Sequence, residues 1–423
     1  MSTGGGWQDQ VGGLTDGVKL ITTKLSTIKD CSPFYAEKFK DIDPTDVRTQ
    51  EDFEKLPFSE KDDLRRVYPL GLQAVPDEEV VRIHSSSGTT GTPVIIPYTA
   101  QDVTDWAIQF ERCYRTAGIT NLDRIQITPG YGLWTAGIGF QLGCERLGAM
   151  AIPMGPGNTE KQLKMMQDLH STVITGTSSY ALLLAEEIST RGLRDKLDLK
   201  KGVIGSERWG EKMRHRIANE LGIEIFDIYG LTEIYGPGIG ISCEAHHGMH
   251  VWEDFVYVEI VDPKTGEVLP DGEVGEIVLT TLRKQGAPLI RYRTHDLSRI
   301  IPGACTCEYG SHHPRIDTIV GRTDDMVKVK GCNMFPAQIE EVINFTEGTS
   351  SEYQMMIEAI NGRDVITLLF ETALTGEDRE KCERELEAIF KAKIGCTPEA
   401  KGVPIGELPR SEKKTKRIFD SRY

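Results

Sequence analysis

Short apolar runs and longer amphipathic segments alternate through the middle of the chain. The apolar runs predict strands at residues 124–128, 149–153, 172–176, 201–205 and 224–229. The amphipathic segments between them predict helices at residues 159–170, 179–188 and 211–221. Strands and helices that alternate in this way form a mostly parallel sheet covered by helices. Because ligands bind at the carboxyl ends of such strands, residues 205–207 and 229–233 become candidate site loops.

The pattern changes on both sides of this segment. Residues 14–75 predict mainly helices, whereas short strands and turn sequences after residue 256 predict an antiparallel β region. Strands and helices beyond residue 325 predict a small α+β domain. We therefore expect an α/β protein with two domains. Residues 1–321 would form a large domain with mixed or parallel sheets, covering helices and the β region, and residues 322–423 a small mobile domain.

Composition and charge narrow the class of protein. The chain has 423 residues, which is enough for more than one domain, and a formal net charge of -15. This charge disfavours binding to nucleic acid or to an anionic membrane. Residues 1–6 lack the basic and apolar regions of a signal peptide, and we expect a cytoplasmic protein. The nine cysteines follow no disulfide framework and are expected to be mostly reduced thiols.

A loop rich in hydroxyl groups and glycine lies between two short predicted strands at residues 80–83 and 94–96. Its members are Ser85, Ser86, Ser87, Gly88, Thr89 and Thr90. Hydroxyl and backbone N–H donors in a flexible loop suit a chain of phosphates. The loop is not a Walker motif, because neither a Lys-Ser/Thr pair nor a helix follows it. The alternative is a polar hairpin turn.

A second segment, residues 129–137, places aromatic side chains among glycines. Such a composition lets the backbone approach a flat ligand, and Tyr131, Trp134 and Ala136 are the candidate lining residues. The alternative is a strand-to-helix turn in which Tyr131 and Trp134 pack in the core.

Five segments occur in the order found in one known family: residues 85–93, 229–233, 292–296, 321–325 and 408–414. Together they resemble the motifs of the adenylate-forming superfamily of acyl-CoA synthetases, and most of all its phenylacetate–CoA ligase branch. The resemblance spans nearly the whole chain. It implies an AMP-forming acid–thiol ligase: ATP would convert an aromatic acid to an acyl-adenylate, and coenzyme A would then displace AMP.

The resemblance also implies roles for individual residues. Glu233 would hold Mg²⁺ against the phosphates of ATP, since hard oxygen ligands suit this ion, and Thr232 would donate to the α-phosphate. Asp296 would accept hydrogen bonds from the ribose hydroxyls, with Arg322 nearby. Without the resemblance, Glu233 would be a charge at a helix N-terminus and Asp296–Arg322 a surface ion pair. The remaining nucleotide-binding residues would be Ser206, Glu207, Asp227, Tyr229 and Gly230.

The C-terminal segment would supply the catalytic cation. By its position in the family motif, Lys414 would stabilise charge at the α-phosphate and the acyl oxygen, although Lys413 stands where the family usually has glycine. After adenylation the small domain would rotate about Asp324. The rotation would move Lys414 out of the active site and bring Gly331 to the path of the coenzyme A thiol.

Four further residues form a candidate metal site: Cys243, His250, Cys305 and Cys307. Three thiols and one imidazole are a suitable tetrahedral set for structural zinc. His246 and His247 are alternative ligands, and unrelated reduced cysteines are the alternative to a metal site. Similar Cys-x-Cys pairs in the resembling branch favour zinc.

Other functions stay open at the level of the sequence. The same adenylation chemistry could serve another acceptor: a deazaflavin, as in the similar coenzyme F390 synthetases, or the thiol of a carrier protein. A nucleotide-binding protein without turnover is a third hypothesis, which the retained Thr232, Glu233, Asp296 and Lys414 disfavour. The expected partners are therefore a small aromatic acid, ATP and coenzyme A. We expect neither nucleic acid nor a membrane as a partner, and a homodimer is left open.

Overall fold

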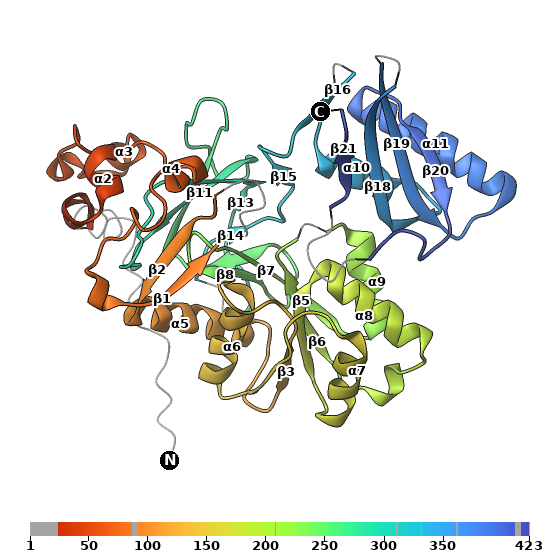
Figure 1. The fold of residues 1–423 in the computed structure, drawn as a ribbon, viewed down its shortest axis with the longest axis horizontal. Helices are drawn as coiled ribbons and strands as arrows, with labels where there is room; N and C mark the ends of the chain where they lie inside the picture. The colour runs from red at the N-terminus through yellow and green to blue at the C-terminus, as the bar shows by residue number, and fades with distance from the viewer. Residues whose placement is uncertain are drawn as a thin grey trace.

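The computed structural model describes residues 24–86, 92–207, 209–308, 312–330, 332–360, 363–410 and 416–422. These residues form a large N-terminal part and a smaller C-terminal unit (Figure 1). The expected α/β fold with two domains is confirmed. Within the described part, no helix is long and apolar enough to cross a membrane.

A nine-stranded mixed sheet is the centre of the large part, with the strand order β13-β14-β9-β8-β7-β6-β5-β3-β4. Its parallel half contains the strands expected from the apolar runs: β3 (Arg124–Ile127), β4 (Met150–Pro153), β5 (Val173–Thr177), β6 (Lys201–Gly205) and β7 (Glu224–Leu231). Its antiparallel half contains β8 (Gly236–Ser242), β9 (Met249–Val251), β13 (Ile300–Ile301) and β14 (Arg315–Ile316).

Helices cover both faces of this sheet. They are α5 (Ala100–Thr116), α6 (Ala136–Leu147), α7 (Thr159–Asp168), α8 (Ser178–Thr190) and α9 (Glu211–Leu221). Successive residues of β6 belong to different cores: Val203 packs with the cluster around α5 and α6, and Ile204 with the cluster around α8 and α9. Because neighbouring strand residues point to opposite faces, the two clusters lie on opposite sides of the sheet.

Strand β8 was not predicted from the sequence, since glycine and proline are depleted in strands. Its glycines are required by close packing against α5. A Cβ atom on Gly238, whose φ is +103°, would lie 2.7 Å from the Phe110 ring. The indole of Trp106 also donates a hydrogen bond of 2.9 Å to the Pro237 carbonyl. Tertiary packing therefore overrides the low preference of glycine and proline for strands in this segment.

Smaller elements complete the large part. A four-stranded antiparallel sheet contains β10 (Val256–Val261), β11 (Gly275–Thr281), β12 (Tyr292–Ser298) and β15 (Gly321–Arg322). A hairpin contains β1 (Val80–Ser85) and β2 (Ile95–Thr99). The N-terminal helices are residues 24–31, α2 (Pro33–Lys38), α3 (Gln50–Glu54) and α4 (Lys61–Arg66). Short 3₁₀ turns are Pro44–Asp46, Asp77–Glu79 and Arg194–Lys196.

The C-terminal unit has a hydrophobic core of its own, formed by residues between Val329 and Ala400. Its sheet has the order β20-β19-β18-β21, from β18 (Thr349–Ile360), β19 (Arg363–Thr372), β20 (Glu399–Val403) and β21 (Ile418–Asp420). The helices are α10 (Pro336–Phe345) and α11 (Gly376–Ile394), and a hairpin joins β16 (Val327–Val329) and β17 (Cys332–Met334). Figure 1 shows this unit next to α8 and α9. The exact boundary at residue 321 stays a prediction.

Candidate functional site

The turn between β7 and β8 brings two candidate regions together. Thr232 and Glu233 follow the last residue of β7, at the carboxyl end of the parallel strands. The Thr232 hydroxyl lies 3.2 Å from the hydroxyl of Thr135, which precedes α6. Thr135 belongs to the aromatic and glycine-rich segment 129–137. The candidate phosphate-binding turn and the candidate acid-binding segment therefore meet at one point.

Glu233 is a buried carboxylate whose neighbour is a cation from a distant part of the chain. The ammonium group of Lys61, at the start of α4, lies 3.0 Å from its carboxylate. Glu233 offers the hard oxygen ligand that Mg²⁺ prefers. Lys61 therefore adds a positive charge at the turn that contains Thr232 and Glu233. The sequence did not predict Lys61, because no local pattern connects α4 with β7.

A chain of hydrogen bonds connects three predicted nucleotide-binding residues with the predicted hinge. The Tyr229 hydroxyl donates to one carboxylate oxygen of Asp296 at 2.8 Å, and Arg322 donates to the other at 2.7 Å. Arg322 also holds Asp324 through two bonds of 2.8 and 2.9 Å. Burial raises the pKa of Asp296, whereas Arg322 and Tyr229 oppose this effect. The side chain of Asp296 is only 14% exposed, so this pair is not a simple surface ion pair.

The other candidate nucleotide-binding residues near this turn lie on the neighbouring strands β6 and β7 or directly after β6. Ser206 follows β6 with a φ of 67°. The Glu207 carboxylate accepts hydrogen bonds from the backbone of Ser179 at 2.9 Å and from the Ser178 hydroxyl. Desolvation raises the pKa of Asp227, on β7, to about 7. At Gly230 a Cβ atom would lie 2.1 Å from the Gly236 carbonyl oxygen, so only glycine fits there.

The aromatic segment contacts the base of the hydroxyl-rich loop. The carbonyl of Leu133 accepts a hydrogen bond of 2.8 Å from the backbone of Ser85, and Ser86 closes the base through bonds of 3.0 Å with Val94. Trp134 is 51% exposed, so it does not pack in the core as the alternative interpretation required. Tyr131 and Ala136 are partly buried.

Several predicted residues lie outside the described part of the chain. In the hydroxyl-rich loop these are Ser87, Gly88, Thr89 and Thr90. The predicted catalytic Lys414, its neighbour Lys413 and the predicted coenzyme A residue Gly331 are also outside it. The roles of these residues stay predictions that rest on the motifs.

A buried lysine supports the turn that contains Thr232 and Glu233, and the sequence did not predict it. Lys284 is fully buried, and its ammonium lies 4.1 Å from the centre of the Tyr98 ring and 4.9 Å from that of the Tyr235 ring. It donates a hydrogen bond to the carbonyl of Ile234, the residue after Glu233. Burial lowers the pKa of Lys284 to about 7.

The four predicted zinc ligands meet in space. Their ligand atoms all lie within 4.8 Å of one another, and the four residues are buried. The sulfur of Cys243 lies 3.7 Å from that of Cys305, and the sulfur of Cys307 lies 3.3 Å from Nε2 of His250. Nδ1 of His250 lies 3.4 Å from the His313 carbonyl, which leaves Nε2 for a metal.

The alternative histidines point to other partners. His246 lies 3.2 Å from the Glu224 carboxylate. His247 lies 3.4 Å from the Arg315 guanidinium. Among the described residues, the set of three thiols and one imidazole therefore fits a tetrahedral metal best.

Comparison with known proteins identifies the family of the chain. The model of the AMP-binding enzyme family matches residues 17–282, and that of the AMP-binding enzyme C-terminal domain matches residues 331–422. The phenylacetate-coenzyme A ligase of Pseudomonas putida is 41% identical over 93% of this chain and 90% of its own length. The enzyme of the same name from Escherichia coli (strain K12) is 42% identical over 92% and 90%.

Solved structures of a 2-hydroxyisobutyryl-CoA ligase share the fold and differ in how closely they superpose. The structure in the postadenylation state, with 2-HIB-AMP, gives a TM-score of 0.86 at 25% identity, over 96% of this chain and 89% of that one. The structure of that ligase in the thioesterification state gives a TM-score of 0.70 at the same identity and coverage. Together with the family models and the curated relatives, these likenesses show that the chain belongs to the AMP-binding enzyme family, on the phenylacetate–CoA ligase branch, as its motifs predicted.

Proposed function

We propose that the protein joins an aromatic carboxylic acid of the phenylacetate type to coenzyme A, with ATP converted to AMP and pyrophosphate. The contact of 3.2 Å between the Thr232 and Thr135 hydroxyls is the observation that supports this proposal, since one hydroxyl belongs to the candidate phosphate-binding turn and the other to the candidate acid-binding segment. The two curated relatives named above bear the name of this activity.

The first half-reaction joins two anions, and the protein must offset their repulsion. An oxygen of the acid carboxylate would attack the α-phosphorus of ATP while the bond to pyrophosphate breaks. Thr232 would donate to the α-phosphate, and Lys61 would add positive charge beside it. Glu233 fits Mg²⁺ as a hard ligand, and the bound ion would supply further charge neutralisation. Tyr229 and Arg322 would orient the Asp296 carboxylate for the ribose hydroxyls.

In the second half-reaction, the thiolate of coenzyme A would attack the acyl carbon of the adenylate, and AMP would leave. The two states of the 2-hydroxyisobutyryl-CoA ligase provide a reference for the domain orientation of this structure. Its TM-score is higher with the postadenylation state than with the thioesterification state. We infer that the described orientation of the small domain is the one that serves adenylation.

We also propose that Cys243, His250, Cys305 and Cys307 bind structural zinc. The site lies where the end of β8, the start of β9 and the loop around Cys305 meet. It is built from residues outside the nucleotide-binding set, so zinc would stabilise loops without taking part in either half-reaction. A cytoplasmic location and a homodimer stay predictions.

The proposal is tested by pyrophosphate release with a panel of aryl acids, each with and without coenzyme A. We expect release that depends on the acid, a thioester product when coenzyme A is present, and a large loss of both in Lys414→Ala. No release with any acid would contradict the proposal. Release without a thioester would instead favour another acceptor, such as a deazaflavin or a carrier-protein thiol.

A further inference from the structure

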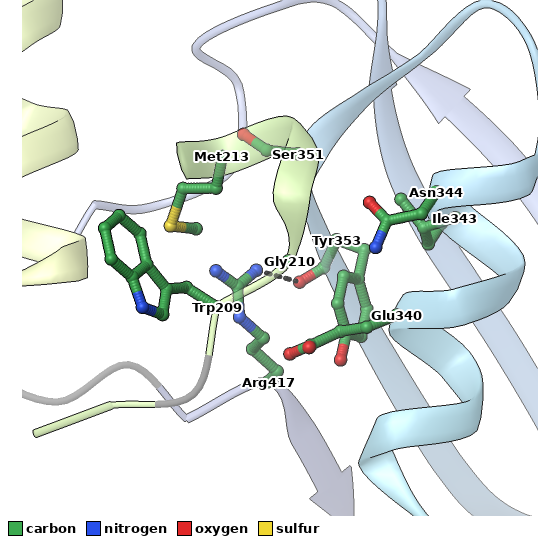
Figure 2. Close-up of a pocket in the computed structure, with 9 residues that line it drawn as sticks. All are labelled: Trp209, Gly210, Met213, Glu340, Ile343, Asn344, Ser351, Tyr353 and Arg417. Atoms are coloured by element: carbon green, nitrogen blue, oxygen red, sulfur yellow. Dashed lines mark hydrogen bonds between the residues drawn. The ribbon is translucent and has the colours of Figure 1, made fainter. Parts of the chain in front are cut away.

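The two domains meet along a contact surface, which we call the domain seam, with α9 and the residues before it on one side and α10 on the other. In Figure 2, Trp209 and Met213 of the large domain face Ile343 and Asn344 of α10, with Arg417 between them. The cavity there has a free volume of about 10 Å³, which is at most enough for one water molecule. The seam is therefore a contact between domains and not a ligand site.

One lysine of the large domain ends in a set of acceptors that belong to the small domain. The ammonium of Lys212, on α9, donates to the carbonyls of Ile343 at 2.9 Å and Thr346 at 2.8 Å, and to the hydroxyl of Thr349 at 2.8 Å. These carbonyls lie at the C-terminal end of α10, where helix carbonyls lack partners within the helix and the helix dipole is negative. The Lys212 side chain is partly buried, and this burial lowers the pKa of its ammonium.

One arginine bridges carboxylates of both domains. Arg410 makes two bonds to Glu186 of α8, at 2.9 and 2.7 Å, and two to Glu371 of β19, at 2.9 and 2.8 Å. Glu371 is fully buried, and Arg216 of α9 also pairs with Glu186 at 2.7 Å. Such paired, charge-assisted bonds are directional and stronger than single neutral ones.

The bonds of Lys212 and the bonds from Arg410 to Glu186 require the present orientation of the two domains, since donor and acceptor lie on different domains. A contact made in only one of two orientations shifts their equilibrium by its own free energy. We propose that Lys212 and Arg410 are positioning residues that hold the small domain in the adenylation orientation and thereby set the balance between the two half-reactions. This inference rests on the proposed two-step function.

The experiment measures the two half-reactions separately in Lys212→Met and Arg410→Gln. Adenylation is followed by exchange of labelled pyrophosphate into ATP in the presence of the aryl acid. Thioester formation is followed in a single turnover, after coenzyme A is mixed with enzyme that already holds the acyl-adenylate. Because each rate is proportional to the population of its orientation, the ratio of thioester formation to adenylation should rise about tenfold in each variant.

Matched variants separate positioning from general destabilisation. Lys393→Met removes an ion pair with Glu341 of α10 that lies entirely within the small domain, and it should leave the ratio unchanged. Lys212→Arg, which keeps the positive charge, should restore most of the wild-type ratio. If Lys212→Met or Arg410→Gln does not fold, Glu186→Gln removes the large-domain partner of Arg410 and should raise the ratio as well.

The outcomes distinguish this inference from the proposed function. A wild-type protein that performs neither half-reaction would contradict the proposed function. A wild-type protein that performs both, with unchanged ratios in the seam variants, would overturn the inference. Equal losses in both half-reactions would also overturn it, because they would indicate a purely structural role.

Discussion

The Asp227 carboxyl shows how a single residue makes stability depend on pH. Desolvation raises its pKa from 3.8 to about 7, although Arg214 opposes the shift. Between these two values the native protein holds a proton that the unfolded chain has released. The free energy of unfolding that this proton contributes is therefore fully present below about pH 4 and is lost as the pH rises through about 7.

We expect Asp227→Asn to remove this dependence. As the pH rises from about 4 to about 7, the wild type should lose stability relative to the variant, by at most about 1.4 kcal/mol per pH unit. Above about pH 8 the difference should be constant. Urea unfolding of both proteins at several pH values measures this difference in the free energy of unfolding. Parallel stability curves across this range would contradict the prediction.

The motif residues of the candidate site could be predicted from the sequence, and their supporting partners could not. Thr232, Glu233, Asp296 and Arg322 lie in short local patterns. Lys61 and Lys284 reach the same turn from distant segments. Such contacts depend on how the elements pack together, and neither lysine stands in a local pattern that predicts its neighbour.

At the scale of elements, the proposed zinc site joins three segments at one edge of the main sheet. His250 lies on β9, Cys243 follows β8, and Cys305 and Cys307 lie in the loop between β13 and β14. Strands β13 and β14 have only two residues each, and their short hydrogen-bonded ladder gives little stability of its own. A tetrahedral metal would fix this edge of the main sheet.

We expect one equivalent of zinc in the purified protein, and Cys305→Ser or Cys307→Ser should lose most of it. Loss of a metal that binds only the folded state should lower the unfolding temperature, and adenylation at low temperature should persist. Elemental analysis and thermal unfolding measure these effects. Cys31→Ser, at an exposed cysteine, is the matched control. Less than about half an equivalent of zinc in the wild type would argue against the site.

The elements that could be predicted are those whose own residues determine them. Strand β6 was expected at residues 201–205, where the structure has Lys201–Gly205, because an apolar run between helices has few alternatives. Strand β8 is the opposite case. Its glycines are explained by the rings of α5 that pack against it, so only the tertiary structure reveals why that sequence forms a strand.

At the scale of the whole molecule, the hydrophobic cores stop at the domain seam. The clusters of the large part end at Ile316, and the cluster of the small domain begins at Val329. Lys212 and Arg410 make side-chain hydrogen bonds across the seam. Contacts between domains of this polar kind permit relative motion.

We therefore expect differential scanning calorimetry to resolve at least two unfolding transitions, because each domain has its own core. ATP with an aryl acid should raise the temperature of the large-domain transition more, since most predicted ligand-binding residues belong to that domain. A single transition, with equal calorimetric and van't Hoff enthalpies, would contradict separate domains.

The atoms that accept hydrogen bonds from Lys212 affect whether small domains can be exchanged between related proteins. Two of them are main-chain carbonyls at the end of α10, and every sequence that forms this helix offers the same atoms. Through these two bonds, Lys212 recognises where a helix ends and not which side chains the helix displays. A small domain transplanted from a divergent relative could keep these two bonds without any compensating substitution, provided that its helix has the same length.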